Sequence, residues 1–294
     1  MFKELFGSYL IESGKLTVEQ YSAIKESMKS MRVKLGIIAV SEKFITEDQA
    51  DEINRAQAAM DKRFGDIAIE KGYLTDDQVC HLLSMQGNPF MQFTQATVEL
   101  GFMTISEIDQ AMSDYQQANN FSDDDIDSIK TGDVDRISSV FVKSGNEFVD
   151  DLFSLALRNI IRFISTEITI SKVEELCSYE YEHIAGQEVK GDHQILLAFA
   201  GNGKSLLSVA STFAKEEFSD VDEDAYDSVC EFTNCINGLY ASRLSKEGIN
   251  IDMLPPLFFN NGVLKSSKIY KLPMTIMDSK VDLIMTIDEE YKIG

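Results

Sequence analysis

Residues 219–256 read SDVDEDAYDSVCEFTNCINGLYASRLSKEGINIDMLPP, and the second half of the chain is organised around them. They predict one long helix followed by a turn. Ser219 and the acids after it suit a helix N-terminus, where a side-chain oxygen caps free N–H groups and carboxylates meet the positive end of the helix dipole. Gly248 predicts the helix end, because glycine readily adopts the left-handed conformation that closes a helix.

The side chains of this helix separate onto two faces at about 100° per residue. The apolar face predicts core packing and consists of Val229, Phe232, Ile236, Leu239 and Tyr240. The opposite face carries Asp227, Glu231, Asn234, Gly238 and Ala241. Glu231 and Asn234 point the same way, one turn apart, and the two small residues leave room for a second surface. An ordinary solvated helix face is the alternative interpretation, since Glu and Asn are common on helix surfaces.

A longer pattern favours a functional face. Asp227, Glu231 and Asn234 follow the spacing D-x3-E-x2-N, and Pro256 comes 22 positions after Asn234. This pattern resembles the signature of the CheC/CheX chemotaxis phosphatases, as do the Asn-x3-Gly spacing that ends at Gly238 and the Leu-Pro-Pro of residues 254–256. The resemblance extends from about residue 145 to the C-terminus. With one such helix, the chain is more similar to CheX, which has one site per subunit, than to two-site CheC.

The resemblance implies an enzyme that hydrolyses the aspartyl phosphate of a CheY-like receiver in chemotaxis or motility signalling. It implies that Asn234 orients the attacking water and that Glu231 holds a cation of the receiver. Asp227 would be a supporting contact, and Pro256 would shape the turn beneath the site. The family also implies a homodimer through the C-terminal domain and no cofactor or metal site of its own, with Mg²⁺ arriving on the receiver. A non-catalytic adaptor for a receiver, or for a pilus or motility component, is the alternative.

Bulk properties set further limits. The 294 residues give room for two domains, and 44% hydrophobic content is typical of globular proteins. A formal net charge of −22 argues against nucleic acid and anionic membranes as partners. No signal region and no apolar run near the ~18 residues of a membrane span are present, so we expect a cytoplasmic protein. The cysteines lack metal-binding spacing and are expected to be reduced core residues without a disulfide: Cys80, Cys177, Cys230 and Cys235.

Residues 1–117 contain four repeats of 29 residues. The repeated positions are Phe6, Leu35, Phe64 and Phe93, then Gly14, Lys43, Gly72 and Gly101, then Thr17, Thr46, Thr75 and Thr104. Each repeat predicts a short apolar helix, a stop at the glycine position and a second helix capped by threonine. A helical hairpin cannot bury its own apolar face, so the four should pack into one all-α domain.

These repeats also resemble the N-terminal domains of type II secretion and type IV pilus ATPases, in particular the MshEN subset. Members of that subset bind cyclic di-GMP with two motifs in tandem, and the spacing of residues 34–57 and 63–86 is similar. The resemblance implies ligand contacts from Lys34, Leu35, Gly36, Arg63, Phe64 and Gly65. The chain departs from the motif at Lys34, Lys43 and Phe64. A helical protein-interaction module without a ligand is the alternative.

Residues 118–143 are rich in Asp, Asn, Ser and Gly and predict an acidic, solvated linker with a short helix near Val134. Residues 144–294 then predict an α+β domain, in which an antiparallel sheet is covered by helices on one face. The expected strands are YEHIAGQEV, HQILLAFA, KSLLSVAS, VLKSSKIYKLPMTIM and KVDLIMTID.

Residues 198–205, AFAGNGKS, imitate a phosphate-binding P-loop. That loop needs glycine at position 198 and a helix after the Lys-Ser pair. We expect SLLSVAS to be a strand, which would make Gly-Asn-Gly a hairpin turn. The sequence therefore favours no nucleotide site.

Overall fold

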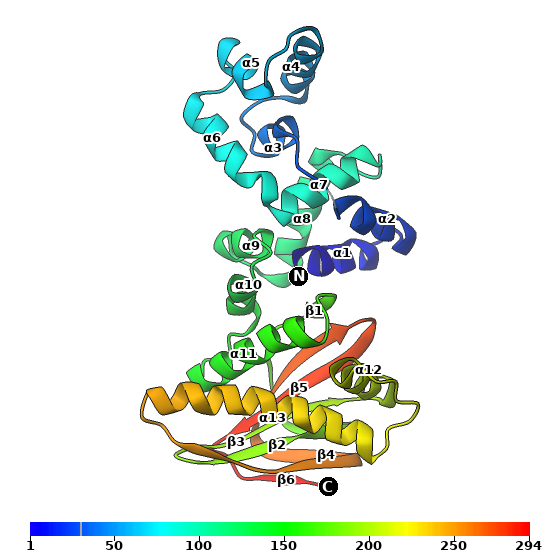
Figure 1. The fold of residues 1–294 in the computed structure, drawn as a ribbon, viewed down its shortest axis with the longest axis vertical. Helices are drawn as coiled ribbons and strands as arrows, with labels where there is room; N and C mark the ends of the chain where they lie inside the picture. The colour runs from blue at the N-terminus through cyan, green and yellow to red at the C-terminus, as the bar shows by residue number, and fades with distance from the viewer. Residues whose placement is uncertain (30) are drawn as a thin grey trace. The chain divides into compact units, whose positions relative to one another are not determined.

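The structure is a computed structural model that describes residues 1–29 and 31–294. The described chain divides into two compact units, Phe2–Asp133 and Val134–Gly294. The first unit is helical and the second combines helices with an antiparallel sheet (Figure 1). The predicted fold classes of both halves are confirmed.

Successive pairs of helices build the first unit: α1 (Phe2–Glu12) with α2 (Val18–Met28), α3 (Leu35–Ser41) with α4 (Glu47–Ala59), α5 (Phe64–Glu70) with α6 (Asp76–Ser84), and α7 (Pro89–Glu99) with α8 (Ile105–Asn119). The second helix of each pair begins after a threonine whose side chain accepts a hydrogen bond from the third helical N–H group. The side chain of that third residue, Gln or Glu, bonds back to the threonine N–H group. These capping boxes satisfy two otherwise unpaired donors each, and the predicted threonine caps are confirmed.

The segment expected to be a linker contains two helices, α9 (Asp123–Lys130) and α10 (Val134–Phe141). Ser122 caps α9, and the acids after it lie in the first turn, where the helix dipole favours negative charge. The apolar residues Ile126, Ile129 and Ile137 are buried. The acidic composition therefore reflects a helix N-terminus, and the division between the two units falls inside this segment.

Three helices and a sheet make up most of the second unit. In chain order the elements are α11 (Glu147–Phe163), β1 (Ile168–Ile170), β2 (Glu174–Gly191), β3 (Gln194–Gly201), α12 (Gly203–Ala214), α13 (Glu223–Lys246), β4 (Ile251–Ile276), β5 (Ser279–Ile287) and β6 (Tyr291–Ile293). The described strands pair antiparallel in the order β1-β4-β2-β3-β5, with β6 beside β4. Because β4 also pairs with β5, the sheet curls on itself, while the helices cover one face (Figure 1).

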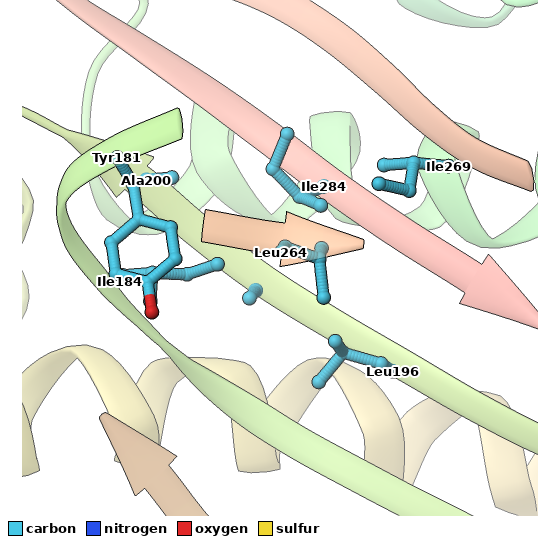
Figure 2. Close-up of a cluster of buried hydrophobic side chains, with 8 residues drawn as sticks. Tyr181, Ile184, Leu196, Ala200, Leu264, Ile269 and Ile284 are labelled. Atoms are coloured by element: carbon cyan, nitrogen blue, oxygen red, sulfur yellow. The ribbon is translucent and has the colours of Figure 1, made fainter. Parts of the chain in front are cut away.

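Both faces of the central strands are buried. On the helix side, the ring of Phe199 in β3 stacks 5.5 Å from the ring of Phe232 in α13. On the other side lies a second buried cluster, which includes Ile184, Leu196 and Ile284 (Figure 2). The double burial explains why HQILLAFA is a continuous apolar run instead of an alternating one.

The expected strand KSLLSVAS is wrong, because these residues form α12. The Asn202 side chain accepts a hydrogen bond from the backbone N–H group of Ser205 and caps the helix. Leu206, Val209 and Ala210 are buried at helical spacing. The helical period was present in the sequence, but the glycines on either side of Asn202 suggested a hairpin instead.

A helix therefore does follow Lys204 and Ser205, as in a P-loop, but no phosphate loop precedes it. Ala198 lies within β3 and pairs with Gly186 on one side and Ile284 on the other. Only Asn202 separates the end of β3 from the start of α12. A P-loop needs a longer glycine-rich turn to wrap backbone N–H groups around phosphate, so the region lacks a nucleotide cradle.

Candidate functional site

Helix α13 carries most of the predicted site residues. It begins at Glu223, and its N-cap is Asp222, whose carboxylate accepts from the N–H group of Ala225 at 3.0 Å. The cap was expected earlier, at Ser219. The helix ends at Lys246, and Gly248 just beyond it has φ of +84°, the left-handed conformation predicted for the stop.

The buried face of α13 is centred slightly away from the predicted apolar stripe. Val229, Phe232, Ile236 and Tyr240 are buried as expected, but Leu239 is 50% exposed. The buried face also includes the polar residues Thr233 and Asn237, which were not expected there. The face of α13 predicted from apolar residues alone is therefore rotated toward Leu239 relative to the face that is buried.

All four cysteines are free, and the prediction that they are core residues holds for one of the four. Cys230, on α13, is buried. Cys80, Cys177 and Cys235 are exposed, so the expectation that they are core residues is wrong. Cysteine is often buried, but its type alone does not place it.

The polar face of α13 forms one wall of a pocket of about 690 Å³. Asp227, Glu231 and Asn234 line it from the helix, and Pro256 lines it from β4. The structure thus brings all four residues of the predicted C-terminal site together. Gln187 from β2 also lines the pocket and was not among the predicted site residues.

Pro256 lies inside β4, opposite Gln187 of β2, and not in a turn as expected. In the described residues, the stretch of β4 around Pro256 pairs with β2 alone. Proline lacks the N–H group that a central strand would need, but an edge strand tolerates it. The strand therefore begins earlier than the sequence suggested.

Gln187 holds the side chain of Asn234 in place. Its Nε2 donates to Oδ1 of Asn234 at 3.1 Å and to the backbone carbonyl oxygen of Leu254 at 2.9 Å. Its Oε1 accepts from Nδ2 of Asn237 at 3.1 Å. Gln187 occupies a position of β2 that faces the helices, between the buried residues Ala185 and Val189. The one signal in the sequence for the role of Gln187 is that a polar residue stands between two alternate, apolar positions of β2 that face the helices.

The charged groups around the pocket are acidic. Its lining includes the carboxylates of Glu216, Asp224, Asp227 and Glu231, and no Lys or Arg is among the described lining residues. Glu231 and Asp227 are exposed and make no ion pair within the described part of the chain. Such a pocket repels a free anion and attracts a cationic group.

A family-level comparison covers this region. Residues 184–275 match the sequence model of the family described as Chemotaxis phosphatase CheX. The match runs from the middle of β2 through almost all of β4 and contains every residue of the pocket named above. No curated protein matches the chain at a significant level.

Solved structures similar to this CheX-like unit cover about half of the chain. The chemotaxis protein CheX from Vibrio vulnificus is 16% identical over 48% of this chain and 99% of its own, with a TM-score of 0.41. CheX from Desulfovibrio desulfuricans is 13% identical over 48% and 99%, with a TM-score of 0.42. A CheX–CheY–BeF3–Mg²⁺ complex from Borrelia burgdorferi matches at 20% identity over 49% and 98%, with a TM-score of 0.40.

Among the described residues that line the pocket on α13, Cys230 is the one with a thiol. Its Sγ lies 3.7 Å from the backbone carbonyl oxygens of Gly186 and Leu257. Burial raises the pKa of the Cys230 thiol to about 11, and the carboxylates of Asp227 and Glu231 act in the same direction. The thiol is therefore neutral near pH 7 and unsuited to act as a nucleophile.

The first unit has a groove of its own, with a volume of about 1440 Å³. Five of the six residues predicted to contact cyclic di-GMP line it, namely Lys34, Leu35, Gly36, Arg63 and Phe64. Gly65 does not line the groove. A side chain at Gly65 would meet Val79 at 2.8 Å, so this glycine allows α5 to pack closely on α6.

The cations of this groove differ in their partners. Lys34 Nζ lies 2.6 Å from a carboxylate oxygen of Glu99, and Arg32 donates to Oε1 of Gln86. Arg63 is exposed and makes no ion pair within the described residues. Arg63 is thus the groove cation best able to meet an anionic ligand.

Two further findings concern metals and membranes. In residues 1–29 and 31–294, no group of three or more His, Cys, Asp or Glu side chains is arranged to hold a metal ion. None of the helices described there has both the length and the apolar character to cross a membrane.

Proposed function

We propose that the CheX-like unit hydrolyses the aspartyl phosphate of a CheY-like receiver. The observation that supports this proposal best is the single pocket that gathers Asp227, Glu231, Asn234 and Pro256, with the Asn234 carboxamide held by Gln187. The family match over residues 184–275 agrees with it.

In the proposed reaction, a water molecule attacks the phosphorus atom in line with the bond to the aspartyl oxygen. That bond breaks, its electron pair leaves with the receiver carboxylate, and inorganic phosphate is released. An acyl phosphate already has a good leaving group, so catalysis consists mainly of positioning and electrostatics. Asn234 is suited to this task because its amide group donates to one oxygen and accepts from another, which orients a water molecule.

The acidic pocket suits a partner that presents cations around its phosphoryl group. Glu231, exposed and unpaired in the described chain, would hold a receiver cation such as a lysine beside the phosphorylated residue. Asp227, one turn earlier, would add to the same negative field. Any Mg²⁺ would arrive as part of the receiver substrate.

The test is a decay assay with a panel of phosphorylated receivers. We expect the full chain, at catalytic amounts, to accelerate the loss of phosphate from at least one receiver well above its spontaneous rate. Binding of a receiver without any change in decay would support the alternative function, a CheX-like adaptor. A full panel with neither binding nor accelerated decay would contradict both.

The edge of the sheet favours a homodimer through the CheX-like unit. Met253, Phe258 and Phe259 are exposed on the part of β4 that pairs with β2 alone. An unpaired strand edge with apolar side chains is suited to pairing with a second copy. A receiver substrate also implies the cytoplasmic location expected from the sequence.

We further propose that cyclic di-GMP binds the groove of the first unit and regulates the chain. Support comes from the size of the groove and from the exposed guanidinium of Arg63 beside Phe64, since arginine can pair with phosphate and stack on a guanine ring.

Titration calorimetry on the full chain tests this second proposal. We expect saturable binding of cyclic di-GMP that is about tenfold or more weaker in Arg63→Ala, because a charge-assisted hydrogen bond to phosphate is lost. Arg55→Ala removes an exposed arginine outside the groove and should bind like the unaltered chain. Absence of heat at saturating ligand would favour a protein-interaction module instead.

A further inference from the structure

Gln187 is the buried centre of a small polar network beneath the pocket. It is 4% exposed, and both ends of its side-chain amide are engaged. The network connects β2, β4 and α13 through Leu254, Asn234 and Asn237. A buried amide with complete hydrogen bonds is held in one orientation, because rotating it would leave donors or acceptors unpaired.

The backbone carbonyl of Leu254 sets this orientation. A carbonyl oxygen only accepts, so the end of Gln187 that faces it at 2.9 Å must be Nε2. The same NH₂ group lies 3.1 Å from Asn234, which must therefore present its oxygen to Gln187. The NH₂ group of Asn234 is then directed away from Gln187. With the opposite orientation of Asn234, two N–H donors would face each other.

The Leu-Pro-Pro segment explains why that carbonyl is available. Gln187 pairs with Pro256 and Val189 with Met253, so the register shifts and two residues of β4, Leu254 and Pro255, lie opposite one residue of β2. A bulge of this kind takes backbone groups out of the regular ladder. The carbonyl oxygen of Leu254 therefore accepts from the side chain of Gln187 instead of from a backbone N–H group of β2.

We propose that Gln187 is a positioning residue, which sets the end of the Asn234 carboxamide that meets the phosphoryl group and its attacking water. This inference rests on the proposed phosphatase function. Without Gln187, Asn234 would sample both amide orientations, and only one presents donor and acceptor in the arrangement that the reaction needs. Gln187 is 4% exposed at the wall of the pocket, and in this proposal it acts through Asn234.

The test compares Gln187→Met, which keeps the shape but removes the donors, with Gln187→Glu, which offers acceptors alone and so favours the reversed Asn234 amide. For both we expect kcat for phospho-receiver hydrolysis to fall about tenfold to 100-fold. The Kd for a beryllofluoride-loaded receiver should change less than about twofold, since the docking carboxylates are intact. In an Asn234→Ala background, Gln187→Met should slow the reaction no further.

Asn237→Ala is the matched control. It removes a buried partner of Gln187 but leaves both contacts of Nε2, so kcat should stay within about threefold of the unaltered chain. Unchanged kcat in both Gln187 variants would overturn the inference, as would an equal loss from Gln187→Met with and without Asn234. Absence of hydrolysis by the unaltered chain would instead remove the phosphatase function on which the inference rests.

Discussion

Asn234→Ala is expected to slow phospho-receiver hydrolysis by about 100-fold or more, the usual cost of losing a preorganised group that acts in the transition state. The side chain lines the pocket and is held through Oδ1 by Gln187, so it loses little freedom when the reaction begins. Truncation removes both the donor and the acceptor that would orient the water. Single-turnover decay of a phosphorylated receiver at saturating protein measures the effect on the chemical step.

The neighbouring residues supply the controls for this prediction. Glu231→Gln should raise KM more than it lowers kcat, because it weakens the hold on a receiver cation without touching the water. Cys235→Ser alters the next residue along α13, which is exposed and does not line the pocket, and its rate should match the unaltered chain. Undiminished hydrolysis by Asn234→Ala would place the chemistry elsewhere.

Gly186→Ala is expected to destabilise the CheX-like unit by about 3 kcal/mol, the upper part of the range for overpacking in a tight core. A β-carbon at this position would lie 2.2 Å from the carbonyl oxygen of Leu197 and 2.5 Å from Cα of Ala198. Both are backbone atoms of β3, which is held between β2 and β5. β3 cannot move away from Gly186 without breaking the hydrogen bonds that pair it with β2 and β5. Urea unfolding of the full chain, followed by circular dichroism, measures the loss.

Gly238→Ala, on α13, is the control for this prediction, because the added β-carbon would meet no close atom. The nearest atom to its new β-carbon would be Sδ of Met253, at 3.9 Å, so the site has room. Alanine favours a helix over glycine by about 0.8–1.0 kcal/mol, and this variant should be slightly more stable than the unaltered chain. Equal midpoints for the two glycine variants would show that the close approach at Gly186 is relieved by local movement.

The sequence predicted the local geometry of the first unit well. The second helix of each repeat is capped as predicted, because the capping threonine and its Gln or Glu partner are only three residues apart on the chain. The threonines are Thr17, Thr46, Thr75 and Thr104. Likewise, Gly14, Gly72 and Gly101 have positive φ at the predicted stops, and Lys43 adopts the same conformation at the fourth. The implied cyclic di-GMP site stays a prediction, because ligand contacts depend on how the repeats pack.

For the site in the second unit, helical periodicity alone predicts that Asp227, Glu231 and Asn234 share one face, and the spacing to Pro256 carries the CheX resemblance. Their chemical roles stay predictions. The periodicity was less useful where polar residues are buried, as Asn237 shows: it lies on the buried face of α13, and its Nδ2 donates to Gln187.

By itself, then, the sequence determined features that depend on neighbours along the chain: helix caps, stops, the amphipathic face of α13 and the positions of most strands along the chain. Only the tertiary structure decided the rest, namely that 203–214 is a helix, that β3 lies too close to Gly186 for a side chain, and that Gln187 of β2 bonds Asn234 of α13. The physical reason is distance along the chain. Gln187, Asn234 and Leu254 are far apart in sequence, and only the pairing of β2 with β4 beneath α13 brings their polar atoms within hydrogen-bond distance.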